Sequence, residues 1–157
     1  MNIKYEEKVP IYPAITALVL ITCLIFLIVL LSQFTEKAIP MTSAAKVILL
    51  ILFLLTLVVL FSFRELTISV TDKQVIFGYG HFQKKFYLSD IENVAFGEYK
   101  FRNYLGYGIR YGLDKTIGYT PRGGRGLRLK FKSGKRAYFI VSARPEELKG
   151  ILEQRYY

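Results

Sequence analysis

Hydrophobic residues follow two patterns along this chain: unbroken runs near its beginning and alternating positions over the rest. Residues 14–34 contain no charged side chain, and residues 44–63 contain only Lys46, close to the start of the run. An α-helix rises about 1.5 Å per residue, so each run reaches about 30 Å, the thickness of the hydrocarbon core of a bilayer. Lys46 can extend its ammonium group to the headgroups. The pattern therefore predicts two membrane-spanning helices.

A cleaved signal peptide is the alternative explanation of the first run. The apolar core of a signal peptide is roughly 7–15 residues long, shorter than residues 14–34, and a second apolar run follows almost at once. The connector between the runs, residues 35–43, is short and contains Pro40. We therefore expect an antiparallel helical hairpin that leaves both chain ends on one side of the membrane.

The side is predicted from lysine and arginine, which cytoplasmic flanks retain. The connector side has Lys37 and Lys46, whereas the other side has Lys4, Lys8, Arg64, Lys73, Lys84 and Lys85. This bias predicts a multi-pass protein of the plasma or inner membrane, with residues 1–13 and 64–157 in the cytosol and residues 35–43 outside it. The single cysteine, Cys23, lies in the middle of the first run, so no internal disulfide can form. We interpret it as a small packing residue.

Alternation with a period of two begins directly after the second run and predicts β-strands. Leu66, Ile68 and Val70 form the first strand, and further runs contain Val75, Phe77, Tyr79, Phe82, Lys84, Phe86 and Leu88. A short turn at residues 88–91 then leads into a fourth strand with Ile91, Val94 and Phe96. Later, Leu127, Leu129 and Phe131 alternate with Arg128, Lys130 and Lys132 before a Ser133-Gly134 turn, which predicts a hairpin with residues 136–141.

The chain closes with an expected amphipathic helix. Pro145 suits its first turn, Glu146 and Glu147 complement its dipole, and Leu148, Ile151 and Leu152 form its apolar stripe. Strands followed by one such helix predict an α+β domain over residues 64–157. This part carries 18 basic and 9 acidic residues, a formal net charge of +9. A basic domain tied to a membrane meets anionic lipid.

The order of these features resembles the prokaryotic membrane-anchored PH-like domain proteins. The residues concerned are the turn Ser89, Asp90 and Ile91, the stretch 106–110, the hairpin turn 133–136 and the helix start 144–148. The resemblance covers essentially the whole chain. It implies a partly open antiparallel β-barrel of about seven strands, plugged by the C-terminal helix, in proteins mostly of unassigned function. One departure is Arg144, which stands where a capping acid or amide is expected, with Ser142 the nearest hydroxyl.

The glycine-rich stretch 106–126 contains several glycines that could cradle a phosphate. Gly106, Gly108 and Gly112 do not have the spacing of a dinucleotide fingerprint, no amphipathic helix follows them, and no Walker sequence is present. An RNA-recognition strand is matched only in part, because Leu105 and Ile109 depart from its pattern, so we expect no nucleic acid partner. The stretch fits an edge strand with a bulge better.

Six basic residues are candidates for binding an anion or a lipid headgroup: Arg110, Arg122, Arg125, Arg128, Lys130 and Lys132. Arg122 and Arg125 lie in residues 121–126, the arginine–glycine loop, which is either a solvated turn or a phosphate-binding loop. Arg110 lies in an aromatic segment, where we expect partial burial and an ion pair with Asp90, Glu92 or Glu98; a headgroup contact is the alternative. The other three residues are either the wet face of a sheet or a stripe that attracts anionic lipid.

Little in the sequence indicates catalysis. His81 is the only histidine and has no cysteine beside it, and no nucleophile motif occurs, so we expect no enzyme, no cofactor and no metal site. The sequence favours a membrane-anchored binding or scaffolding protein whose cytosolic domain engages anionic lipid or a membrane or cytosolic protein partner. The alternative is a structural subunit of a membrane complex or a homo-oligomer without a lipid ligand.

Overall fold

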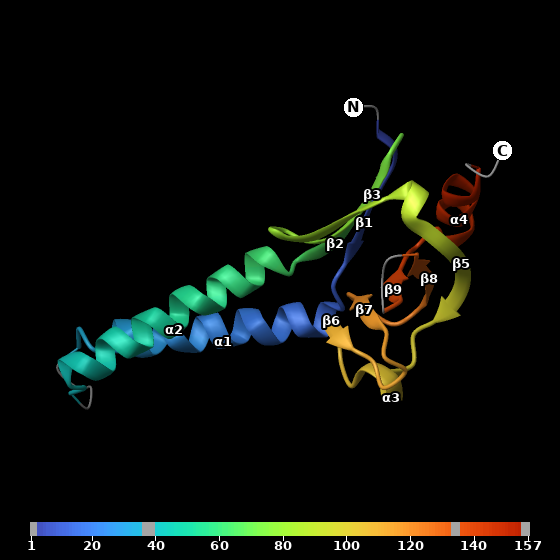
Figure 1. Ribbon diagram of the computed structural model, residues 1–157. Coiled ribbons are helices and arrows are strands. Elements are labelled where there is room, and N and C mark those ends of the chain that lie inside the picture. Colours follow the sequence, from blue (N-terminus) through green and yellow to red (C-terminus); the bar gives the residue numbers. More distant parts are fainter. Residues whose placement is uncertain (1–2, 36–39, 133–135, 155–157) are drawn as a thin grey trace. The chain divides into compact units, whose positions relative to one another are not determined.

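The computed structural model describes residues 3–35, 40–132 and 136–154 of the chain (Figure 1). The chain divides into two compact units. One is the helical hairpin, residues 13–62, and the other is the β unit, which combines residues 1–12 with residues 63–157. The β unit is therefore assembled from both sides of the hairpin in sequence.

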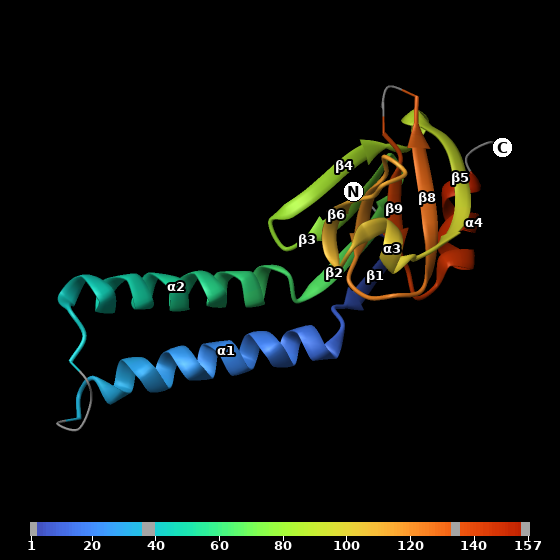
Figure 2. The same cartoon turned by 90° about the horizontal axis from the view of Figure 1, so that it is seen from below.

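The helical hairpin consists of α1 (Pro13–Ser32) and α2 (Ser43–Ser62), which run antiparallel and side by side (Figures 1 and 2). Thr42 Oγ1 accepts a hydrogen bond of 3.3 Å from Ala45 N and so caps the start of α2. Both helices are long and apolar enough to cross a membrane. Among their described residues only Cys23 is buried, so the apolar side chains face outward. The two apolar helices expected from the sequence are present.

The β unit contains a four-stranded antiparallel sheet in the order β1-β2-β3-β4. Its strands are β1 (Ile3–Pro10), β2 (Glu65–Thr71), β3 (Gln74–Tyr79) and β4 (Phe82–Tyr87). A five-stranded sheet has the order β5-β8-β9-β7-β6. Its strands are β5 (Ile91–Glu98), β6 (Gly108–Tyr111), β7 (Ile117–Thr120), β8 (Arg125–Phe131) and β9 (Tyr138–Val141).

Three short elements complete the unit: the 3₁₀ turn η1 (Leu88–Asp90), α3 (Phe101–Tyr104) and α4 (Pro145–Glu153). The core lies between the two sheets. Phe77 of β3 meets Tyr119 of β7 edge to face at 5.0 Å, and Phe86 of β4 stacks on Phe131 of β8 at 4.1 Å. Leu148 and Leu152 of α4 belong to the same buried cluster. Such aromatic contacts add to the free energy gained by burying apolar area.

The sheet arrangement corrects the barrel that the resemblance implies. The described residues form two sheets with nine strands, where about seven strands in one partly open antiparallel barrel were expected. One pair, β7 with β9, is parallel. The path of the chain explains the parallel pair. After β7 the chain forms β8, which is not a neighbour of β7 in the sheet, and then returns antiparallel to β8. The returning strand, β9, lies between β8 and β7 and so runs parallel to β7. The α+β class and the closing helix agree with the sequence prediction.

Strand β1 was not predicted, because residues 1–13 were taken as a separate segment. Tyr5, Glu7 and Val9 point into the core in alternation, and the strand pairs with β2 so that Val9 lies opposite Leu66. The alternation was hard to recognise since its middle residue is an acid. Strands β1 and β2 precede and follow the hairpin, so their pairing brings the two ends of the hairpin together.

Glu7 is buried with three hydrogen-bond donors. Its carboxylate accepts bonds from Tyr5 Oη at 2.7 Å, Ser142 Oγ at 2.7 Å and Ala143 N at 2.5 Å. Burial, together with the hydrogen bond to Glu7, raises the pKa of Tyr5, so this hydroxyl keeps its proton. A buried carboxylate is tolerated only when its oxygens are satisfied in this way. Glu7 therefore fastens β1 to the segment between β9 and α4.

The start of α4 confirms that Arg144 provides no cap, because its side chain makes no capping hydrogen bond. Instead, Ser142 Oγ accepts a bond of 3.0 Å from Arg144 N, and the Arg144 guanidinium pairs with Glu147 at 2.9 Å. Ser142 thus supports the approach to the helix and donates to Glu7 at the same time. The expected apolar stripe is confirmed, with Leu148 and Leu152 buried.

We predict that Glu7→Ala lowers the free energy of unfolding by about 2–4 kcal/mol, because three donors lose their acceptor. Urea unfolding of the full chain in mild detergent, followed by near-ultraviolet circular dichroism of the tyrosines, measures the effect. Glu6→Ala is the matched control, since Glu6 is exposed on the same strand, and a change within about 0.5 kcal/mol is expected there. Equal effects of the two substitutions would contradict a stabilising role for the three hydrogen bonds that Glu7 accepts.

Candidate functional site

The arginine–glycine loop connects β7 to β8 and lies beside the start of α4. A pocket of about 400 Å³ is formed by Arg122, Gly123, Gly124 and Arg125 together with Val141, Ser142, Ala143, Pro145 and Glu146. The loop is held by backbone hydrogen bonds, since Gly124 O accepts from Tyr99 N at 2.9 Å and Arg125 O from Ser142 N at 3.2 Å. Gly124 has a φ of 139°, a conformation that glycine adopts without strain. The loop is thus a fixed turn.

The two arginines of the loop differ in their partners. Arg125 pairs with Glu146 at 2.7 Å, and its guanidinium carbon lies 5.6 Å from the centre of the Phe96 ring. Half-buried Arg122 has no carboxylate partner among the described residues. Glu146 also places negative charge in the pocket. Of the two, Arg122 is therefore the better candidate for an anion.

The expected basic stripe on β8 is paired with groups of the protein. Arg128 Nη2 lies 2.5 Å from Asp114 Oδ2, Lys130 Nζ lies 2.7 Å from Glu92 Oε1, and Lys132 Nζ donates to Ser89 O at 2.9 Å. These side chains are partly exposed, so each pair adds little stability. The pairs nevertheless reduce the positive charge that the stripe presents. These three residues therefore fit a solvent-exposed face of the sheet with paired side chains better than an unpaired cationic stripe.

The partial burial and the ion pair expected for Arg110 are contradicted by the structure. It lies on β6, the edge of the five-stranded sheet, and is exposed rather than partly buried. Its Nε donates to Tyr107 O at 3.0 Å, and no carboxylate of the described residues pairs with it, including Asp90, Glu92 and Glu98. An edge strand leaves its flanking aromatic residues in solvent, so the charge needs no buried partner. The predicted edge position of the glycine-rich strand is confirmed, and Gly108 has a φ of 96°.

The arginine–glycine loop also touches the point where the chain leaves the β unit for the hairpin. Tyr12 N donates to Pro121 O at 2.8 Å, and Tyr12 directly precedes α1. On the return, Arg64 O accepts from Ile11 N at 3.1 Å. Arg122, Tyr12 and Arg64 are therefore neighbours of the hairpin ends within the β unit. This placement could not be derived from sequence, because the unpredicted β1 creates it.

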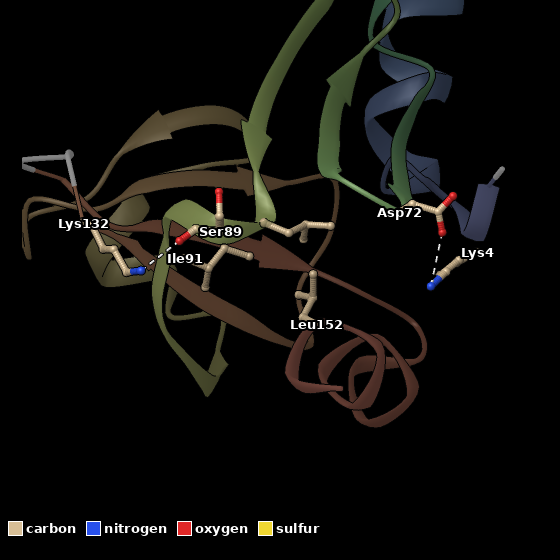
Figure 3. Close-up of a pocket in the computed structure, with 7 residues that line it drawn as sticks. Lys4, Asp72, Ser89, Ile91, Lys132 and Leu152 are labelled. Carbon is tan, nitrogen blue, oxygen red and sulfur yellow. Dashed lines mark hydrogen bonds and ion pairs between the residues drawn. The ribbon is translucent and has the colours of Figure 1, made fainter. Parts of the chain in front are cut away.

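A second pocket, of about 510 Å³, lies elsewhere in the β unit (Figure 3). Lys132 reaches the backbone of Ser89 on one side and Lys4 pairs with Asp72 at 3.2 Å on the other, with Ile91 and Leu152 between them. Lys4 lies six residues from Pro10 along β1, a distance of about 20 Å from the hairpin end. Both lysines already have partners, so this pocket is a weaker anion site than Arg122.

Few features of the described residues indicate catalytic or metal chemistry. Within residues 3–35, 40–132 and 136–154, no group of three or more histidine, cysteine, aspartate and glutamate side chains could hold a metal ion. In the described part of the chain, the buried Tyr79 Oη has no hydrogen-bond partner, and burial raises the pKa of Tyr79 above its ordinary value. A protonated phenol without a neighbouring base offers no nucleophile.

Comparisons with protein-family models, with curated proteins and with solved structures find no match.

Asp114 gives the Arg128 pair a measurable pH dependence. Burial alone would raise the pKa of Asp114, but hydrogen bonds from Thr116 and Asn103 and the charge of Arg128 outweigh it and lower the pKa to about 2. The unfolded chain thus binds this proton more readily, so the stabilisation is complete above about pH 4 and is lost as the pH falls toward 2.

We predict that Asp114→Asn lowers the unfolding temperature of the full chain in detergent at pH 6, and that the gap from the unmodified chain closes as the pH falls from about 4 to 2. Circular dichroism melting curves at a series of pH values measure both. A gap that stays constant down to about pH 2 would show that Asp114 acts without its charge.

Proposed function

We propose that this chain is a membrane-anchored, non-catalytic binding protein whose basic β unit engages anionic lipid headgroups. In this proposal the helical hairpin spans the plasma or inner membrane, and both termini with the β unit lie in the cytosol. The lysine and arginine distribution supports this orientation. The PH-like relationship is part of the proposal and is supported by strands closed by a C-terminal amphipathic helix.

The observation that carries the proposal is the hydrogen bond from Tyr12 N to Pro121 O. It holds the arginine–glycine loop against the residue that precedes the first apolar helix. If α1 begins at the membrane surface, Arg122 lies within reach of the headgroups there. A guanidinium binds phosphate oxygens in a bidentate manner, so a lipid phosphate is a suitable ligand for it.

The charge of the β unit acts in the same direction. Residues 64–157 carry a formal net charge of +9, although part of it is neutralised locally by pairs such as Arg128 with Asp114. Each basic residue close to an anionic surface contributes about 1 kcal/mol of attraction. Arg122 directly follows Pro121, whose carbonyl accepts from Tyr12 N, and no described carboxylate pairs with it. Its contribution is therefore expected to exceed that of a paired residue on β8.

A structural subunit of a membrane complex is the second candidate function. It is favoured by the outward-facing apolar side chains of α1 and α2, which offer surface to other membrane helices as well as to lipid. A second copy or a different protein could occupy that surface. In this case the lipid preference predicted below would be absent.

We predict that the full chain in bilayer nanodiscs prefers spin-labelled phosphatidylglycerol to spin-labelled phosphatidylcholine, and that added salt weakens the preference. Arg122→Ala should reduce the preference by up to about fivefold, the equivalent of about 1 kcal/mol. Electron paramagnetic resonance of the protein-bound lipid fraction measures it.

Lys130→Ala is the matched control, because it removes the same charge from a residue that is already paired with Glu92. A smaller change than that of Arg122→Ala is expected. If neither lipid is preferred in the unmodified chain, headgroup binding is wrong and the structural subunit becomes the better hypothesis.

A further inference from the structure

The β unit displays an apolar surface on one continuous part of the chain, residues 101–113, here named the α3–β6 segment. Its outward-facing residues are Phe101, Leu105, Ile109, Tyr111 and Leu113. Leu105 and Leu113 are 68% and 76% exposed, although they are among the most hydrophobic side chains of the unit. Single exposed apolar residues are ordinary, but here five lie within thirteen consecutive positions, and this set is called the apolar patch below.

The backbone under this patch is braced by hydrogen bonds. Leu113 N donates to Asn103 O at 3.0 Å, Gly106 O accepts from Tyr99 Oη at 2.9 Å, and Gly112 N donates to Thr116 O at 2.8 Å. Buried Tyr104 stacks on Phe139 at 5.7 Å and anchors α3 to the sheet. The apolar side chains are thus presented outward on a fixed scaffold.

Leu105 has an unusual backbone conformation. It caps the end of α3 in the left-handed region, with φ 53° and ψ 32°, where glycine is the favoured residue. Its side chain gains little burial within the protein in return, since it is largely exposed. A contact outside the chain would give this exposed leucine the burial that the fold does not.

The charges within the segment are of one sign, and Asp114, the acidic residue that directly follows it, is paired with Arg128. Between Tyr99 and Leu113 the sequence contains Lys100, Arg102 and Arg110 and no acidic residue. Arg110 is exposed, and none of the described carboxylates pairs with it. Apolar and aromatic side chains bordered by cations match the interface of a bilayer, where headgroups are polar or anionic and acyl chains begin a few ångströms deeper.

The position of the patch is tied to the hairpin ends through an aromatic stack. Tyr107, in the middle of the segment, stacks on Tyr12 with ring centres 5.7 Å apart, and on its other side it stacks on Tyr99 at 5.2 Å. Tyr12 is the residue before α1. Leu105 lies two residues from Tyr107, at most about 7 Å along the chain. The α3–β6 segment therefore contacts the residue that directly precedes α1 in the chain.

We propose that the α3–β6 segment docks into the interface of the bilayer that holds the helical hairpin, with Leu105 and Leu113 in the upper acyl region and Arg102 and Arg110 at the headgroups. This docking rests on the membrane anchoring in the proposed function. In addition to the two helices α1 and α2, this segment would contact the membrane and so fix the orientation of the β unit. The docking depends on apolar burial, and so it does not require anionic lipid.

The experiment uses the full chain with Cys23→Ser and single cysteines labelled with an environment-sensitive fluorophore, in nanodiscs of phosphatidylcholine at high salt. Probes at Leu105→Cys and Leu113→Cys should lose emission to doxyl-labelled lipid and be protected from aqueous iodide. A probe at Lys130→Cys on β8 should show the reverse, with a several-fold larger loss to iodide.

Other outcomes overturn the docking. Probes at 105 and 113 that iodide quenches and lipid does not would mean that the patch faces water. Probes protected from both quenchers would mean that a second copy or another protein covers it. A control probe at Val58→Cys in α2 tests the anchoring itself. If doxyl lipid does not quench that probe, the membrane proposal fails and the docking fails with it.

Neutral lipid and high salt keep this test separate from the headgroup test. Lipid quenching at position 105 without any preference for phosphatidylglycerol would support docking and contradict headgroup selectivity. The opposite result would retain the headgroup function and reject docking. Leu105→Gly provides a further comparison, because it relieves the left-handed backbone while removing the apolar side chain. It should increase iodide quenching of a probe at Leu113→Cys without loss of folding.

Discussion

The pairing of β1 with β2 is the interaction on which the rest of the structure depends. These strands lie on opposite sides of the helical hairpin in sequence, and their ladder runs from Ile3 opposite Thr71 to Pro10 opposite Glu65. Closing a loop as long as the hairpin has an entropic cost that grows only slowly with length. Buried side chains such as Val9 and Leu66, together with the Glu7 hydrogen bonds, offset that cost. The pairing joins the segments before and after the hairpin in one β unit.

The same pairing determines which surface features lie near the hairpin. It brings Tyr12 to Pro121 and to Tyr107, so the arginine–glycine loop and the α3–β6 segment both contact the residue that precedes α1 in the chain. The sheet pocket that contains Lys4 lies at the other end of β1. Arg122, which follows Pro121, lacks a described carboxylate partner, whereas Lys8 near the end of β1 pairs with Glu65, and Arg128 and Lys130 on β8 are paired as well. The distribution of unpaired charge and exposed apolar area is thus uneven, which favours the surface next to Tyr12 as the functional one.

The periodicity of apolar residues was sufficient to predict both apolar helices, most strands and α4. In β2, β8 and α4, for example, the face that is buried carries apolar residues, and this produces a pattern visible in the local sequence. The periodicity missed β1, where acidic Glu7 occupies an inward position and is satisfied by Ser142 and Ala143 far along the chain. It also could not show that Lys130 meets Glu92, 38 residues away, or that the chain order places β9 parallel to β7. Arg110 was expected to be partly buried because its neighbours are aromatic, but it lies on an edge strand and is exposed. Contacts between distant segments decide these features, and the Ser133-Gly134 turn lies outside the described residues.

The most direct test of the account is the register of β1 against β2. In the full chain with Cys23→Ser, cysteines at Lys8 and Thr67 replace residues that lie opposite each other on the outer face of the sheet. The account predicts that mild oxidation joins them by a disulfide in the full chain in mild detergent. The pair Lys8→Cys with Ser69→Cys, two residues out of register, should form a disulfide far more slowly. Mobility in a denaturing gel after cleavage at a protease site placed in the connector distinguishes the linked chain. Equal cross-linking of both pairs, or none, would contradict a β unit assembled across the hairpin.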